Sequence, residues 1–242
     1  MDGATPGGRV TGVPAFVLHA YPFRETSLIV EAFTARYGRI AWVARGARRA
    51  GSAMRGLLLP FQPMAAGWGG KSELRTLHKV EWIGGLPPLR ATALLCGLYV
   101  NELLLRLLRR EDPHEQLFDL YRQALVDLSA GGALSVTLRR FERALLREIG
   151  YALLLDHDAQ TGAPLEPTGL YEYRIGVGPV RAGTHPDGLE LRGQTLLDMA
   201  RDDYTHPVSM QESKILTRRV LAHYLGEQPL HTRDLLRSLQ SL

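Results

Sequence analysis

The residues in this sequence best suited to chemistry are arginines, and that chemistry is the binding of a polyanion. The stretch between Glu31 and Glu73 contains no acid and seven basic residues: Arg36, Arg39, Arg45, Arg48, Arg49, Arg55 and Lys71. Residues 1–85 hold eleven Lys or Arg against five Asp or Glu, a net charge of +6, whereas residues 86–242 hold eighteen against twenty, a net of −2. This asymmetry predicts a nucleic-acid contact in the N-terminal part.

The basic residues gather around a glycine-containing loop, Arg45-Gly-Ala-Arg-Arg49, where backbone and guanidinium groups can approach phosphates closely. The alternative is a solvated charged loop, but solvated surfaces usually mix both signs of charge. The predicted DNA-binding residues are Arg39, Arg45, Arg48, Arg49, Arg55 and Lys71. One or two of the interleaved aromatic residues are expected to stack on bases, and the others to pack in the core: Phe33, Tyr37, Trp42, Phe61 and Trp68.

Two other sequence patterns suggest that the protein could be an enzyme. Residues 65–72 loosely resemble a phosphate-binding loop ending in Lys71-Ser72, and residues 152–156 resemble an apolar run ending in a magnesium-binding Asp. A phosphate loop needs a helix directly after it, but residues 74–83 predict a strand, so nucleotide hydrolysis stays only an alternative. His157 could join His185 and Asp187 around a metal, yet nothing fixes that geometry. We therefore expect no metal, no other cofactor and no enzyme activity.

Short β-rich runs separated by Gly and Pro fill the region 13–84, after a disordered N-terminus at 1–12. The expected strands are 15–20, 27–34, 39–45, 57–68 and 74–83. Five short strands favour a closed barrel of the OB type, with an SH3-like barrel as the near alternative.

Helical spacing replaces this pattern after Gly84-Gly85 and Pro87-Pro88. Helices are expected at 89–110, from Pro113 to 129, and at 135–149, and again at 196–201, 211–225 and 232–239. Residues 151–192 form an irregular or β-like insertion within this helical domain of 88–242. The fold class is therefore multi-domain α+β, with an N-terminal OB barrel and a mostly helical remainder.

The cysteine content and the hydropathy of the sequence indicate in which cellular compartment the protein acts. The one cysteine, Cys96, excludes an internal disulfide and an all-cysteine metal site. No apolar run reaches the roughly 18 residues of a membrane-spanning helix. We expect a soluble, cytoplasmic protein that does not bind membranes.

A second basic cluster falls on the predicted helix at 135–149. If Leu138, Phe141, Leu145 and Ile149 are buried, then Arg139, Arg140, Arg143 and Arg147 share the opposite face. That face is either an ordinary solvated surface or a site for an acidic peptide or a nucleic acid. Lys214, Arg218, Arg219 and Arg233 form a weaker C-terminal version.

These segments, in this order and spacing, resemble the bacterial RecO family of DNA repair proteins. The resemblance runs from about Pro14 to Leu236 and rests on Phe16-Val-Leu-His19, Glu25-Thr-Ser-Leu28, Arg45-Gly-Ala-Arg48, Leu59-Pro-Phe-Gln-Pro63, Gly97–Leu104, Leu138-Arg-Arg-Phe-Glu142 and Thr217-Arg-Arg-Val-Leu221. It implies an OB barrel, a helical domain and a recombination mediator without catalytic chemistry.

The resemblance also implies partners. RecO-like proteins bind single- and double-stranded DNA, anneal complementary strands, and work with RecR, and often RecF, to load RecA onto strands coated by single-strand-binding protein. They bind the acidic, Phe-ended C-terminal tail of that protein. The first Arg of the Leu-Arg-Arg-Phe segment lies at the tail site in the family, which implies a tail site at Arg139, with Arg140 and Arg143 beside it. Nucleoid association follows from these partners.

One departure from the family is plain. Many RecO-like sequences carry four zinc-binding cysteines after the central helices, whereas residues 151–183 contain none. This subdomain is therefore expected to hold together by packing alone, without zinc.

Overall fold

The computed structural model describes residues 8–183, 189–226, 230–232 and 235, which belong to two compact units. The first unit comprises residues 1–132 and 232–242, and the second comprises residues 133–231. No helix among the described residues is long and apolar enough to cross a membrane.

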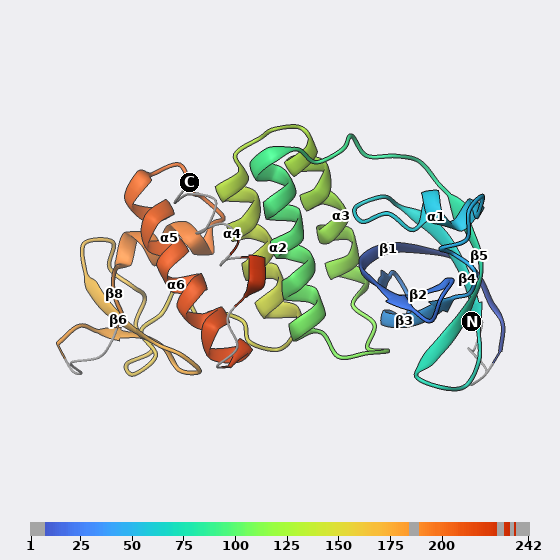
Figure 1. Cartoon of the computed structure of the whole chain (residues 1–242). Helices are drawn as coiled ribbons and strands as arrows, with labels where there is room; N and C mark the ends of the chain where they lie inside the picture. Colours follow the sequence, from blue (N-terminus) through green and yellow to red (C-terminus); the bar gives the residue numbers. More distant parts are fainter. Residues whose placement is uncertain (1–7, 184–188, 227–229, 233–234, 236–242) are drawn as a thin grey trace. The chain divides into compact units, whose positions relative to one another are not determined.

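A closed barrel forms the N-terminal part of the first unit (Figure 1). Its strands are β1 (Val10–Phe23), β2 (Ser27–Thr34), β3 (Gly38–Ala44), β4 (Met64–Gly69) and β5 (Leu74–Trp82), in the closed order β1-β2-β3-β5-β4. Only the β3–β5 pair is parallel, with Ala41 opposite Leu74, and β4 closes the barrel against β1. This five-stranded order, with a short helix between β3 and β4, confirms the predicted OB-type barrel.

Two boundaries in the barrel differ from the sequence prediction. Strand β1 begins at Val10, which pairs with Trp68, so part of the expected disordered terminus is strand. The strand expected at 57–68 is wrong in its first half, because helix α1 (Ala53–Leu57) occupies its start and β4 begins only at Met64. Pro60 and Pro63 explain the late start, since proline cannot donate to a strand ladder.

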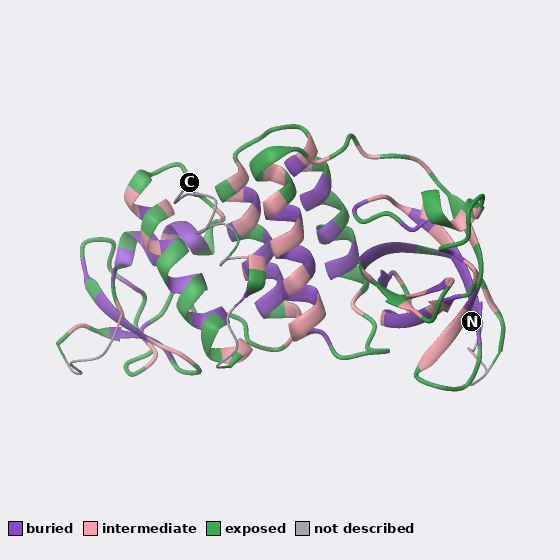
Figure 2. Ribbon diagram, viewed as in Figure 1, coloured by how far each residue is buried: buried purple, intermediate pink, exposed green. Residues whose placement is uncertain are grey.

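The barrel interior is filled by apolar side chains from every strand. Figure 2 colours the buried residues of β1 purple. Trp42 is fully buried, and its ring centroid lies 5.2 Å from that of Trp68. Four of the five aromatic residues expected to be divided between base stacking and the core are buried, and the fifth, Tyr37, packs edge-on against Trp68. Four of these residues therefore belong to the core, and Tyr37 is half-buried.

Helices α2 (Ala91–Leu107) and α3 (Glu115–Ser129) confirm the first two predicted helices and belong to the same unit as the barrel. Phe16 of β1 lies 5.5 Å from Phe118 and 5.1 Å from Tyr121 of α3, measured between ring centroids. Phe33 of β2 joins the same aromatic cluster. The outer face of β1 and β2 is therefore partly covered by α3.

Asn101 connects three elements within this cluster. Its buried side-chain amide donates to the Leu18 carbonyl of β1 over 2.9 Å and accepts from the Tyr121 hydroxyl of α3 over 2.7 Å. Burial raises the pKa of Tyr121, so its hydroxyl stays protonated and able to donate.

Replacing this amide is expected to loosen the helices from the barrel. Asn101→Leu should lower the free energy of unfolding by about 2–4 kcal/mol, because it leaves a buried hydroxyl and a buried carbonyl without their partner. Urea unfolding followed by circular dichroism measures the loss. The control Gln116→Leu, at an exposed position of α3, should change stability by less than about 0.5 kcal/mol; equal losses for both variants would contradict the bridging role.

The second unit contains α4 (Leu134–Glu148), α5 (Gly193–Ala200), α6 (Pro207–Leu225) and a small antiparallel sheet. The sheet has the order β7-β6-β8, from β6 (Leu170–Arg174), β7 (Gly178–Arg181) and β8 (Leu189–Arg192). The predicted helices here are confirmed within a few residues, and the sheet lies within the β-like insertion expected at 151–192. The helix expected at 232–239 lies mostly outside the described residues.

The small sheet is held by buried side chains and by one carboxylate that accepts backbone hydrogen bonds. Tyr171, Tyr173 and Leu191 are buried in it, and Asp158 accepts hydrogen bonds from the backbone of Gln160, Thr161 and Arg181. These backbone hydrogen bonds outweigh burial and lower the pKa of Asp158. Among the described residues, no group of three or more potential metal ligands gathers, and His185 and Asp187 lie outside them.

Candidate nucleic-acid interface

The loop that follows β3 presents the predicted arginines at one end of the barrel. Ala47 is fully buried and anchors the loop, while Gly46 takes a positive φ of 70° that lets the chain turn sharply. The flanking Arg45, Arg48 and Arg49 are all exposed. A buried alanine between outward-facing arginines therefore fixes where the guanidinium groups point.

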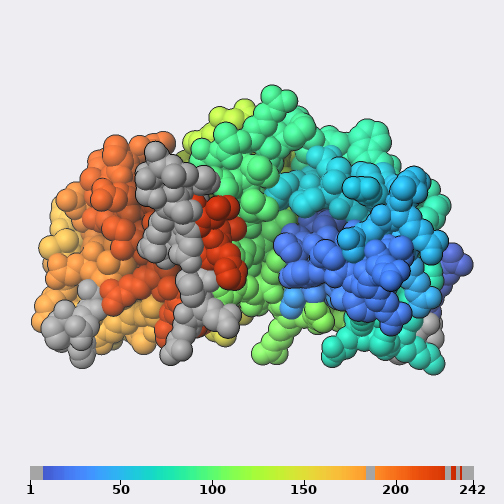
Figure 3. All heavy atoms as spheres, in the orientation of Figure 1, coloured from blue at the N-terminus to red at the C-terminus, as the bar shows by residue number. Residues whose placement is uncertain are grey.

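The turn between β1 and β2 lies directly beside this loop. The Arg48 backbone N–H donates to the Thr26 carbonyl over 2.8 Å, and the Arg48 guanidinium donates to the Arg24 carbonyl over 3.3 Å. In Figure 3 the blue atoms of β1 and β2 adjoin the light-blue atoms of the following segment. Arg24 is exposed, so this contact adds a fourth arginine to the cluster.

We call this surface the arginine loop cluster and define it as Arg24, Arg45, Arg48, Arg49 and Arg55. Arg55 comes from α1 and is also exposed. No ion pair joins any of these side chains to another described residue. Glu25 lies in the same turn, so the cluster is strongly but not purely basic. An array of unpaired cations is suited to a phosphate backbone.

Arg39, also predicted to bind DNA, has a structural place instead. Its guanidinium donates to Glu31 over 3.1 Å and to the Leu108 carbonyl over 3.1 Å, and Arg110 pairs with the same Glu31. Burial lowers the pKa of Arg39, while the charge of Glu31 raises it. Because the Arg39 guanidinium already donates to Glu31 and to the Leu108 carbonyl, we leave Arg39 out of the cluster.

The segment that ends α2 lies over the start of β3. The Glu111 N–H donates to the Arg39 carbonyl over 2.9 Å, and the Glu111 carboxylate accepts from Arg75 of β5 over 2.7 Å. A Cβ at Gly38 would lie 1.9 Å from the Asp112 carbonyl oxygen, which shows how closely the two backbones approach. The start of β3 is therefore covered and is not open to a nucleic acid strand.

Lys71 lies apart from the arginine loop cluster. It is exposed in the turn before β5, and the parallel register places the start of β5 beside the middle of β3 rather than beside Arg45. The turn leads into strand β5 and not into a helix, which removes the geometry that a phosphate-binding loop requires.

Aromatic residues that the sequence analysis did not select lie near the cluster. Tyr21 is 47 % exposed, and its ring centroid lies 4.3 Å from that of His19 on β1. The Arg24 guanidinium lies 5.2 Å from the Phe23 ring centroid. The signal available in the sequence was the run Tyr21-Pro-Phe-Arg24, which places two aromatic rings directly before a turn with a basic residue.

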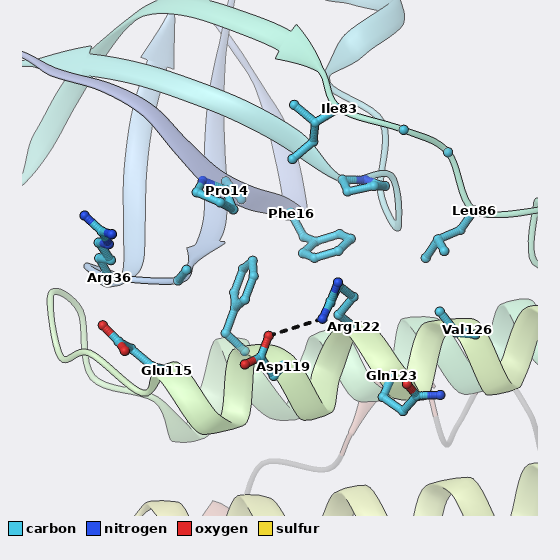
Figure 4. A pocket seen from close by; sticks show the side chains of 16 residues that line it. Pro14, Phe16, Arg36, Ile83, Leu86, Glu115, Asp119, Arg122, Gln123 and Val126 are labelled. Atoms are coloured by element: carbon cyan, nitrogen blue, oxygen red, sulfur yellow. Dashed lines mark ion pairs between the residues drawn. The ribbon is translucent and has the colours of Figure 1, made fainter.

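A cavity of about 630 Å³ lies between the barrel and α3 in the same unit (Figure 4). Its wall on the barrel side is mostly apolar, with Pro14, Phe16 and Ile83, and also includes the charged Arg36. On the α3 side Arg122 and Asp119 point toward each other over 3.6 Å, beside Glu115. This mixture of charges does not select a polyanion, and the cavity suits a protein segment better than DNA.

The predicted arginine face of α4 is wrong for its first member. Arg139 is only 3 % exposed and pairs over 2.5 Å with Glu142, which is fully buried. Arg140 and Arg143 both pair with Asp202, at 2.6 Å and 3.6 Å. Within the described part of the chain, Arg139 Nε and Arg143 Nη1 have no hydrogen-bond partner although they are buried. Buried donors of this kind can donate hydrogen bonds to a carboxylate.

The closed barrel and its exposed arginine loop cluster define an OB-fold protein with a basic surface at one end of the barrel. Sequence comparison gives the family. The profile described as Recombination protein O N terminal matches residues 10–86, and that described as Recombination protein O C terminal matches residues 89–234.

Curated relatives agree over nearly the whole chain. The DNA repair protein RecO of Nitrosospira multiformis is 58 % identical over 231 residues, covering 95 % of this chain and 96 % of the relative. The DNA repair proteins RecO of Dechloromonas aromatica and Aromatoleum aromaticum are 51 % and 49 % identical, each covering 97 % of this chain and 98 % of the relative. The chain belongs to the RecO family of DNA repair proteins.

Proposed function

We propose that this protein is a recombination mediator that binds single- and double-stranded DNA and anneals complementary strands without catalytic chemistry. With RecR, and in some pathways RecF, it would help to load RecA onto strands coated by single-strand-binding protein. The observation that carries the proposal is the arginine loop cluster, whose exposed cations have no ion-pair partner among the described residues. Its place of action is the nucleoid in the cytoplasm.

The arginine loop cluster supports annealing by electrostatics. Two complementary strands repel each other through their phosphates, and a surface that neutralises part of this charge raises their rate of encounter. The β2–β3 face is partly covered by residues 108–112, so we place the DNA on the loops rather than across that face.

The tail of single-strand-binding protein is proposed to dock at α4. Its terminal carboxylate would find the unsatisfied donors of Arg139 and Arg143, with Arg140 at the exposed rim. Docking there would raise the local concentration of the barrel beside a coated strand, so that two modest affinities combine.

Binding of a fluorescent single strand to the full chain across a salt series tests the proposal. Three to five phosphate contacts predict a slope of log K against log salt of about −2 to −3.5. A duplex of equal length should also bind with a negative slope. Failure of the protein to bind either DNA would contradict the proposal.

A protein-only adaptor is the second candidate function, and the cavity between β1 and α3 favours it. In that case RecR or another partner would bind the barrel, and DNA affinity would be weak and insensitive to salt. Phosphate release that depends on Lys71 would instead indicate the nucleotide hydrolase that the phosphate-loop pattern suggested.

A further inference from the structure

The second unit contains an aromatic surface that the proposed function does not use. Tyr151, directly after α4, stacks on Tyr224 of α6 with ring centroids 3.8 Å apart and an angle of 16° between ring planes. Tyr151 remains 44 % exposed, so the stacked pair presents ring surface to solvent. His223 lies edge-on to Tyr224 at 5.0 Å.

A small cavity of about 160 Å³ opens beside this pair. It lies between the end of α4, the turn from β6 to β7, and the last turns of α6, where Val220 and Tyr224 line it. The buried Tyr173 also lines it, and its hydroxyl is held by a hydrogen bond to the Leu154 backbone. The cavity is smaller than the roughly 300 Å³ of a small-molecule site, and its aromatic walls suit one planar ring.

The charges around the cavity favour a nucleic acid as the source of that ring. Helix α6 carries four basic or titratable residues and no acid from Ser213 to Gly226: Lys214, Arg218, Arg219 and His223. The positive charge of Arg218 lowers the pKa of Lys214, and the negative charge of Glu142 on α4 partly opposes this shift. Arg147, on the last turn of α4, is exposed one turn before Tyr151.

No acidic side chain is among the residues that line the cavity, although Glu148 pairs with Arg147 at 3.5 Å. Bases of a single strand stack on exposed aromatic rings while nearby cations contact the phosphates on either side. We propose that the Tyr151–Tyr224 pair is a second site for single-stranded nucleic acid, where one nucleobase stacks on Tyr151 and a flanking phosphate meets Arg147.

This inference rests on the proposed DNA binding and deepens it. Annealing brings two strands together. A stacking site on the second unit would bind bases, whereas the arginine loop cluster would bind phosphates. The site is distinct in kind from that cluster, because part of its affinity would come from stacking on the bases in addition to contacts with phosphates.

The test compares two strands on variants of the full chain. One strand is oligothymidine of about 30 nucleotides, which exceeds the roughly 4–16 nucleotides that one OB barrel covers. The other has the same phosphates but abasic sugars. Tyr151→Leu should weaken binding of oligothymidine about 5- to 150-fold and leave binding of the abasic strand unchanged. Tyr151→Phe, which keeps the ring, should bind both strands as the wild type does.

Controls separate stacking from folding and from the proposed function. Leu170→Ala, at an exposed position of the same unit, should change neither affinity, and the unfolding temperatures of all variants should agree. The stacking site would be overturned if Tyr151→Leu left the oligothymidine affinity unchanged, or if it weakened the binding of both strands equally. In either case, steep salt-dependent DNA binding by the wild type would still support the proposed function. A Phe-ended acidic peptide that lost its binding on Tyr151→Leu while DNA binding persisted would reassign the site to a protein, and that too would overturn it.

Discussion

Replacing Arg45, Arg48 and Arg49 together by alanine is expected to weaken binding of single-stranded DNA about 100-fold at roughly 0.1 M salt. Each guanidinium is exposed and without an ion-pair partner among the described residues, so each is available for one phosphate. Three lost contacts should also flatten the slope of log K against log salt by about 2. The measurement is fluorescence anisotropy with a labelled strand, and the annealing rate of complementary strands should fall with it.

A charge-matched control makes this result specific to the loop. Arg90, Arg109 and Arg122 are exposed on and around α2 and α3, and changing these three to alanine lowers the net charge equally. The control should shift affinity by less than about threefold, because distant charges are screened beyond roughly 10 Å at 0.1 M salt. Similar losses in both triple variants would show that overall charge, and not the arginine loop cluster, holds the DNA.

The second large effect is expected at the buried ion pair of α4. Glu142→Leu should lower the free energy of unfolding by about 3–5 kcal/mol, because it leaves the Arg139 guanidinium buried beside an apolar side chain. Urea unfolding measures this loss. Arg147→Ala on the exposed side of α4 is the control and should cost less than about 1 kcal/mol.

A double variant then separates stability from docking. Replacing both partners, Arg139→Met with Glu142→Leu, should restore stability to within about 1–2 kcal/mol of the wild type, since no buried charge remains. If Arg139 helps to hold the tail of single-strand-binding protein, this stable variant should lose affinity for a tail peptide but still anneal naked strands. Full tail binding by the double variant would remove Arg139 from the proposed docking site.

Local sequence patterns were sufficient for the barrel and for most helices. Alternating apolar residues bounded by Gly and Pro predicted β2 at its observed bounds and β5 within one residue, and leucine spacing predicted α2 and α3. Strand β4 was misplaced because Leu57–Leu59 has strand-like composition, yet Ser52 starts a helix and two prolines follow. Patterns among neighbouring residues therefore predict most helices and strands, although they do not always give the exact residue at which an element begins or ends.

The candidate site was harder to predict because it depends on contacts between distant segments. Arg39 and Arg45 look equivalent in the sequence. In the structure, Arg39 donates to the Leu108 carbonyl, and Arg110 pairs with Glu31, which is also the partner of Arg39. Arg24 joins the cluster because its backbone carbonyl accepts a hydrogen bond from the Arg48 guanidinium, and no local sequence pattern predicts this contact. Arg139 lies on the polar side of a helical wheel, and yet α4 buries it together with Glu142.

Cross-linking tests the central claim most directly. A single strand that carries bromodeoxyuridine is irradiated with the full chain at moderate salt, and the linked peptides are identified by mass spectrometry. We predict cross-links within residues 19–26 and 45–55, where the β1–β2 turn and the arginine loop cluster lie together. Cross-links confined to residues outside the barrel would contradict the assignment of the arginine loop cluster as the DNA site.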